Sequence, residues 1–132
     1  MPQVPVGAKG ELKLLVTSEV AVDFLGMEDA RVLGTPFMIG WMEMAARNAI
    51  KAHLDPGFDT VGTMVHIRHL AAAPIGMQVT FQAEVLEVDG RRILCRVEAF
   101  DEKEKIGEGT HERTIIQVAK FAQRLISKRD QS

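Results

Sequence analysis

The strongest hydrophobic pattern in the chain is a run of apolar residues at helical spacing between positions 35 and 54. The apolar stripe consists of Phe37, Met38, Trp41, Met42, Ala45, Ala46 and Ala49, and Ile39 and Ile50 widen it. Thr35 is suited to cap the helix and Pro36 to occupy its first turn, while Asp55-Pro56-Gly57 ends it. Because so little of this helix is polar, we expect other parts of the chain to cover most of its surface.

The rest of the chain is predicted to be mostly strands. We expect strands at Glu11 to Thr17, Thr60 to Leu70, Gln78 to Val88, Arg91 to Asp101 and Lys105 to Val118. In the third strand Val79, Phe81, Ala83 and Val85 alternate with polar residues, and this alternation predicts one buried and one solvated face. Asp89-Gly90 predicts a tight hairpin between the third and fourth strands.

Two shorter segments complete the prediction. Ser18 to Leu25 is typical of a short helical turn, and a short amphipathic helix is expected around Phe121, Ala122, Leu125 and Ile126. The fold class is therefore α+β, with one antiparallel sheet wrapped around one long central helix in a single domain over residues 1–132. Residues 1–10 are expected to form a loose lead and residues 129–132 a solvated tail. So apolar a helix in so small a domain also favours a homodimer.

Composition excludes several classes of partner. The chain has 132 residues, 46% of them hydrophobic, and its net charge of -2 comes from residues spread along the sequence. No basic run predicts binding to nucleic acid or anionic lipid, and no apolar stretch reaches the roughly 20 residues of a membrane helix. The start of the chain lacks the pattern of a signal peptide, so we expect a cytoplasmic location. Cys95 is the only cysteine, which excludes an internal disulfide and a Cys-based zinc site within the chain.

The sequence also lacks the motifs of nucleotide-binding proteins, serine hydrolases and zinc proteases. Acid and base chemistry by scattered polar groups is what remains. Glu43 lies at the edge of the apolar stripe of the predicted helix, an expensive place for a carboxylate. It is either a surface residue paired with Arg47 or a partly desolvated group that accepts a proton from water or orients a base.

His69 and Thr35 are the other candidates. His69 shares the strand parity of Val65 and Ile67, so it points toward the helix unless a bulge intervenes. It is either a hydrogen-bonded core residue or part of a site. Thr35 is first of all a helix cap, yet its hydroxyl also lies beside free backbone N–H groups that stabilise an oxyanion.

The last predicted strand places Gly107, Gly109, His111 and Arg113 on one face. Glycines inside a strand often mark the close approach of a ligand or of another backbone. The simpler interpretation is a twisted edge strand with exposed charges. Alternatively, Arg113 pairs with a carboxylate at the site or contacts a phosphate.

Three segments resemble the fluoroacetyl-CoA thioesterase-like branch of the hot-dog superfamily. They are TPFMIGWMEMA from Thr35, GTMVHIRHLAAAPIGMQV from Gly62 and GEGTHERTIIQ from Gly107, and the similarity extends from Gly10 to about Phe121. The resemblance implies a hot-dog fold, a dimer joined through its sheet edges, and an acyl-CoA substrate held near the subunit boundary. A higher oligomer built from such dimers stays open. It implies hydrolysis of a small or short-chain acyl-CoA to the free acid and CoA.

Carried over position by position, the resemblance makes Thr35, Glu43 and His69 the catalytic residues. It places Gly62 and Arg113 near the acyl group, and Phe37 is a further candidate for substrate contact. No metal and no cofactor are expected, since coenzyme A is part of the substrate.

The sequence leaves several points open. Residues 26–33, which would cover the acyl pocket, contain no aromatic residue, so fluoroacetyl specificity is not carried over. Attack by water and attack through an acyl-threonine both remain possible. Two other functions also remain: hydration or dehydration of an enoyl or 3-hydroxyacyl thioester, and acyl-CoA binding without catalysis.

Overall fold

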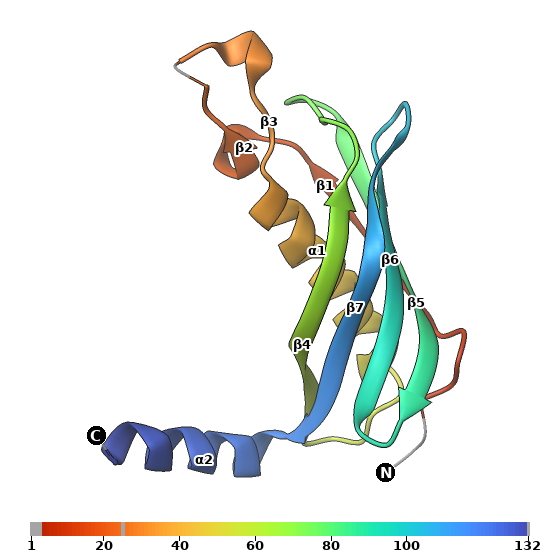
Figure 1. Cartoon of the computed structure of the whole chain (residues 1–132), viewed down its shortest axis with the longest axis vertical. Coiled ribbons are helices and arrows are strands. Elements are labelled where there is room, and N and C mark those ends of the chain that lie inside the picture. The colour runs from red at the N-terminus through yellow and green to blue at the C-terminus, as the bar shows by residue number, and fades with distance from the viewer. Residues whose placement is uncertain (1–3, 25, 132) are drawn as a thin grey trace.

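The computed structural model describes residues 4–24 and 26–131, and it consists of one antiparallel sheet curved around one helix (Figure 1). The five strands lie in the order β1, β5, β6, β7, β4. Their bounds are Lys9–Leu15 (β1), Phe58–His69 (β4), Gln78–Asp89 (β5), Arg92–Phe100 (β6) and Lys105–Gln117 (β7). The helix α1 (Thr35–Lys51) packs against one face of this sheet. The predicted α+β architecture is therefore confirmed.

The core lies between α1 and the sheet because each element is apolar on one side. In α1 the buried side chains are Met38, Met42, Ala45, Ala46, Ala49 and Ile50. The expected alternation holds in β5 and β6, where every second residue from Val79 to Val85 and from Ile93 to Ala99 is buried. Trp41 stacks on Phe81 with ring centroids 6.1 Å apart, and full burial of a ring like that of Phe81 stabilises the fold by about 1.5–3 kcal/mol.

The hairpin between β5 and β6 is confirmed, but its loop is displaced by one residue. Asp89 pairs with Arg92, so the two loop residues are Gly90 and Arg91 instead of Asp89 and Gly90. Gly90 has a φ of 61°, a conformation that glycine adopts at little cost.

Several predicted boundaries were wrong. Residues 4–10 of the expected loose lead are ordered by contacts, because β1 already begins at Lys9, Val4 is buried, and the Gly7 N–H donates to the Val85 carbonyl. At the other end, the helix α2 (Val118–Asp130) includes the first two residues of the predicted tail. Thr35 is not the cap of α1: Gly34 occupies that position and makes no side-chain hydrogen bond.

A small ribbon lies beyond the N-terminal end of α1 (Figure 1). It consists of the strands β2 (Ala21–Val22) and β3 (Val32–Leu33). One short 3₁₀ helix, Ser18–Val20, precedes β2, and another, Glu28–Ala30, lies between β2 and β3. The predicted helical turn from Ser18 to Leu25 is thus limited to three residues, with Leu25 outside the described residues. Arg31 holds the ribbon together by donating to the carbonyls of Ser18, Ala21 and Val22.

The helix α2 projects from the opposite end of the sheet and extends past the edge strand β4 (Figure 1). All its described side chains are at least partly exposed, including Leu125 and Ile126. In the part of the chain that the structure describes, neither helix has the length and apolar character needed to cross a bilayer.

Candidate active site

Thr35 and His69 are in direct contact at the N-terminal end of α1. The Thr35 Oγ1 lies 2.8 Å from the His69 Nδ1. Thr35 is the first residue of α1, and His69 is the last residue of β4. The expected row of free backbone N–H groups is not present, because Pro36 has no N–H and the N–H groups of Phe37 and Met38 donate to the Gly34 carbonyl. The hydroxyl therefore lies beside a base and at the positive end of the helix dipole, which favours a developing negative charge.

The strand β4 directs His69 toward the helix although a bulge does intervene. The register shifts between Gly62 and Met64, before the segment that carries His69. Beyond the bulge Ile67 packs against the core and His69 follows on the same side. The His69 Nε2 is buried and has no hydrogen-bond partner among residues 4–24 and 26–131. Burial lowers the pKa of His69 and so favours the neutral imidazole.

Glu43 lies in a second group of polar residues, two helical turns further along α1. Its Oε1 is 3.7 Å from an Arg113 Nη and 3.6 Å from the His111 Nε2. Gly62 makes this approach possible, because a Cβ at that position would overlap the Glu43 carboxylate. Glu43 retains 38% of its side-chain exposure, so its carboxylate is shielded on one side and open at the β4 edge.

Arg113 is buried, and all three of its side-chain nitrogens have a hydrogen-bond partner. Its Nε donates to the Thr60 hydroxyl and one Nη to the Thr60 carbonyl, while the other Nη faces the His111 Nε2 at 3.1 Å. The Glu43 carboxylate is the one acidic group within 4 Å of this guanidinium in the described part of the chain. Removing one partner of a buried charged pair leaves an uncompensated charge, so the Glu43 carboxylate serves as the counter-charge of the buried Arg113.

His111 has a defined protonation state in this group. Its Nδ1 lies 2.8 Å from the Met64 carbonyl oxygen. Because a carbonyl oxygen can only accept a hydrogen bond, Nδ1 carries the proton. The Nε2 then accepts from Arg113. Burial lowers the pKa of His111, consistent with a neutral ring. Sequence reasoning placed His111 on the correct face of its strand but did not include it among the site residues.

The structure therefore brings the predicted residues together in two groups. Thr35 and His69 form one, and Glu43, Gly62 and Arg113 form the other. Eight residues separate Thr35 from Glu43, which corresponds to about 12 Å along the helix axis. Phe37 lies in the first turn of α1 and is 44% exposed, near the first group. Glu43 contacts neither Thr35 nor His69 in a single chain.

The glycines of β7 have a structural role. A Cβ at Gly107 would lie 2.7 Å from the Met38 sulfur, and one at Gly109 would overlap the backbone of β4. The expectation of an edge strand with exposed charges was wrong, because β7 lies between β6 and β4 and buries His111 and Arg113. These two glycines therefore allow α1 and β4 to approach β7 closely.

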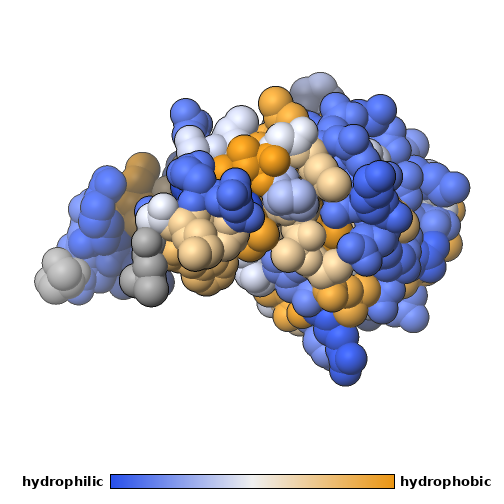
Figure 2. Space-filling model, turned by 90° about the horizontal axis from the view of Figure 1, so that it is seen from above, coloured by the Kyte–Doolittle hydropathy of each residue, from blue (hydrophilic) through white to orange (hydrophobic). Residues whose placement is uncertain are grey.

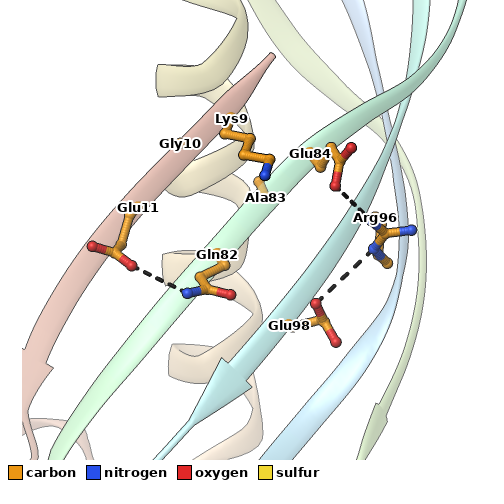
Figure 3. A pocket seen from close by; sticks show the side chains of 8 residues that line it. All are labelled: Lys9, Gly10, Glu11, Gln82, Ala83, Glu84, Arg96 and Glu98. Atoms are coloured by element: carbon orange, nitrogen blue, oxygen red, sulfur yellow. Dashed lines mark hydrogen bonds and ion pairs between the residues drawn. The ribbon is translucent and has the colours of Figure 1, made fainter. Parts of the chain in front are cut away.

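A separate hollow of about 370 Å³ lies on the face of the sheet that is turned away from α1 (Figure 3). Its polar residues bond to one another: Glu11 accepts from Gln82, and Arg96 pairs with Glu84 and Glu98. None of the predicted site residues lines it. We therefore assign it no part in the chemistry of Thr35 and His69.

Comparisons with known proteins show the family of this chain. The family model for fluoroacetyl-CoA-specific thioesterases matches residues 16–119. The chain is 45% identical to the fluoroacetyl-CoA thioesterase of Streptantibioticus cattleyicolor over 94 residues, which are 71% of this chain and 68% of that protein.

Solved structures give the same result. A structure of a fluoroacetyl-CoA thioesterase has a TM-score of 0.85 at 36% identity, covering 96% of this chain and 98% of that one. A hot-dog-like protein from Thermanaerovibrio acidaminovorans has a TM-score of 0.84 at 24% identity, covering 94% and 92%, and supports the fold.

One antiparallel sheet curved around one long helix is the hot-dog fold, and the chain shares it with the solved thioesterase. Within this class, the chain belongs to the fluoroacetyl-CoA-specific thioesterase family. It is a thioester hydrolase of the acyl-CoA thioesterase type.

Proposed function

We propose that this protein hydrolyses a small acyl-CoA to the free acid and CoA, with Thr35, His69 and Glu43 as its catalytic residues. The observation that supports this most directly is the 2.8 Å contact between Thr35 Oγ1 and His69 Nδ1. It gives a nucleophile or a polarising hydroxyl an adjacent neutral base. The proposal includes a cytoplasmic location.

The reaction follows from this contact. A neutral His69 takes a proton from the attacking oxygen, which belongs to water or to the Thr35 hydroxyl, as that oxygen bonds to the carbonyl carbon. The carbonyl oxygen becomes negative, and the positive end of the α1 dipole stabilises it. The carbon–sulfur bond then breaks, and the imidazolium returns its proton to the departing CoA thiolate. If the acyl group has passed to Thr35, water releases it by the same steps.

Glu43 is proposed to act in a site that two copies of the chain complete. In one chain it is separated from Thr35 by about two helical turns, yet it faces the free edge of β4 beside Gly62. An edge strand with free backbone groups is suited to pair with a second sheet edge. Antiparallel pairing of two β4 strands reverses one copy, so that Glu43 of one copy approaches Thr35 and His69 of the other.

Exposed apolar residues on β4 favour the same association. Met64 and Val65 are 37% and 49% exposed on this edge strand. A two-fold axis would bury both residues in each copy against their equivalents. We therefore propose a homodimer joined through β4, from which a higher oligomer can also be built.

A free-thiol release assay with purified protein tests the proposed function. The panel is acetyl-, fluoroacetyl-, propionyl-, butyryl- and crotonyl-CoA, with thiol release and loss of the enoyl absorbance followed in parallel. We expect thiol release from at least one small acyl-CoA. Hydration of crotonyl-CoA without thiol release, or ligand binding without turnover of any thioester, would contradict it.

A further inference from the structure

A second hollow, of about 530 Å³, lies where α2 leaves the sheet. It is lined by Arg91, Gln117, Lys120, Gln123, Arg124 and Ser127. Three of these six residues are basic and none is acidic. The whole chain has a net charge of -2, so this concentration of positive charge is local.

Two separate segments bring the basic groups together. Lys120 and Arg124 are four residues apart on α2, so they lie on one face of the helix, together with Gln123 and Ser127. Arg91 comes from the loop between β5 and β6, where its carbonyl accepts from the Ile115 N–H at 2.8 Å. The N-terminal end of α2, with the positive end of the helix dipole, lies at the same position.

These three cations have no ion-pair partner within 4 Å among the residues that the structure describes. The neighbouring Arg92 pairs with Asp89. In the hollow of Figure 3, by contrast, Arg96 is neutralised by two glutamates. Like charges held close together without a counter-ion repel one another, and a multiply charged anion removes that repulsion.

We propose that this hollow, which we call the phosphate hollow, binds the phosphate groups of the acyl-CoA. The inference rests on the proposed function, since that function supplies a ligand with a diphosphate and a 3′-phosphate at one end. Guanidinium groups bind phosphate oxygens in pairs through their planar N–H donors, and Lys adds a point charge. Gln117, Gln123 and Ser127 provide neutral donors around them.

The phosphate hollow serves the thioester site of a second copy. In one chain the two lie at opposite ends of β4, because Gln117 pairs with Phe58 at its start and His69 is its last residue. Eleven residues of strand span about 36 Å. Antiparallel β4 pairing places the α2 of one copy at the end where Thr35 and His69 of the other lie, and α2 already extends past the β4 edge (Figure 1).

Charge reversal on α2 tests the proposal. We would measure KM for the most rapidly hydrolysed acyl-CoA and for the same acyl group on pantetheine, which lacks phosphates. In the double variant Lys120→Glu, Arg124→Glu we expect KM for acyl-CoA to rise about tenfold through lost charge-assisted contacts. The KM for acyl-pantetheine should stay within about twofold, since neither residue contacts the acyl arm.

The matched control is Lys9→Glu, Lys13→Glu, which changes the net charge by the same amount on β1, the strand at the other edge of the sheet. It should leave both KM values unchanged, and far-UV circular dichroism checks the folding of both doubles. An unchanged KM for acyl-CoA in the α2 variant would overturn the proposal. Equal rises for the two substrates, or an equal rise in the control, would overturn it as well.

The hollow remains testable if the wild type hydrolyses neither substrate, a result that would contradict the proposed function alone. Binding of adenosine 3′,5′-bisphosphate is then measured by calorimetry. Binding to the wild type and the control, but not to the α2 variant, would support a phosphate site. No binding to the wild type would overturn it.

Discussion

The Thr35 hydroxyl and the His69 imidazole are 34 residues apart in the sequence and 2.8 Å apart in the structure. The sheet determines this contact, since β4 must pair with β7 along its whole length for its last residue to reach the N-terminal end of α1. Each of the two side chains has an ordinary structural explanation alone. Together they place a base beside a hydroxyl at a helix N-terminus.

The pair can be tested by removing each partner. We expect His69→Ala to lower kcat/KM by about 10²-fold or more, as the loss of a general base typically does. Thr35→Val should lower it comparably if the hydroxyl is the nucleophile, whereas Thr35→Ser should retain most activity. Single-turnover kinetics with a labelled acyl group would show whether the acyl group passes through the protein. Unchanged rates in His69→Ala and Thr35→Val would remove the pair from the mechanism.

Mixing two inactive variants tests whether Glu43 acts across the dimer. The two variants are His69→Ala, which removes the base beside Thr35, and Glu43→Gln, and each is expected to lower kcat/KM by about 10²-fold or more. If the site combines Glu43 of one copy with Thr35 of the other, every mixed dimer contains one intact site. Random reassociation of equal amounts should then restore about a quarter of wild-type activity, by the symmetry of a two-fold dimer. No recovery, with mixed dimers confirmed by native mass spectrometry, would show that each chain works alone.

Gly62→Ala should impair catalysis more than folding. The added Cβ would displace the Glu43 carboxylate, which is the flexible end of a side chain and can move. We expect kcat/KM to fall about tenfold with about 1 kcal/mol of destabilisation, since the displaced carboxylate is flexible and stays within reach of the buried Arg113. Gly40→Ala is the control: a Cβ there meets nothing within 4 Å, and it should stabilise α1 by about 0.5–1 kcal/mol. Equal activity of the Gly62 and Gly40 variants would contradict the proposed role of Gly62.

Stability should fall as the pH drops below about 6.5, the ordinary pKa of histidine. Burial lowers the pKa values of His69 and His111 in the folded state. In the interval between each folded pKa and 6.5, the unfolded chain therefore binds protons that the folded chain does not. In that interval each histidine lowers the free energy of unfolding by at most about 1.4 kcal/mol for each unit by which the pH falls. Urea denaturation followed by Trp41 fluorescence would measure this, and His111→Gln should give a shallower slope. The same slope in that variant would show that His111 is protonated in the folded state.

Cys95 should be unreactive in the native protein. It is fully buried in β6, and burial raises the pKa of its thiol to about 11, so the reactive thiolate is scarce. A colorimetric thiol reagent should detect no protein thiol before unfolding and one per chain in guanidinium. This matters for the thioesterase assay, since the thiol detected there is then CoA. Rapid labelling of the native protein would show that β6 opens readily.

Much of the fold could be predicted because its signals are local. The alternation in β5 and β6 shows directly which residues face the helix, and the stripe of α1 shows that it must be covered. Two predictions were wrong: Thr35 as the helix cap and β7 as an edge strand. Both outcomes depend on more distant parts of the chain. Thr35 is not the cap because α1 already begins at Thr35 with Gly34 as its cap, and the Thr35 hydroxyl contacts His69. The strand β7 is internal because β4 returns to pair with it.

The candidate site divides in the same way. The sequence identified Thr35, Glu43, Gly62, His69 and Arg113 as one group, whereas the structure separates them into two groups along α1. His111 was not predicted as a site residue, because a strand pattern does not show that a histidine will accept a hydrogen bond from a neighbouring arginine.

The amino-acid sequence alone determined the long apolar helix, the alternating strands and the polar residues placed where burial is costly. Side-chain spacing within a single element encodes these features. Tertiary structure alone decided the order of the strands, the free edge at β4 and the partner of each polar group. Those outcomes depend on which apolar surfaces pack against each other and exclude water. Residues far apart in the chain form these surfaces, so no single element determines the result.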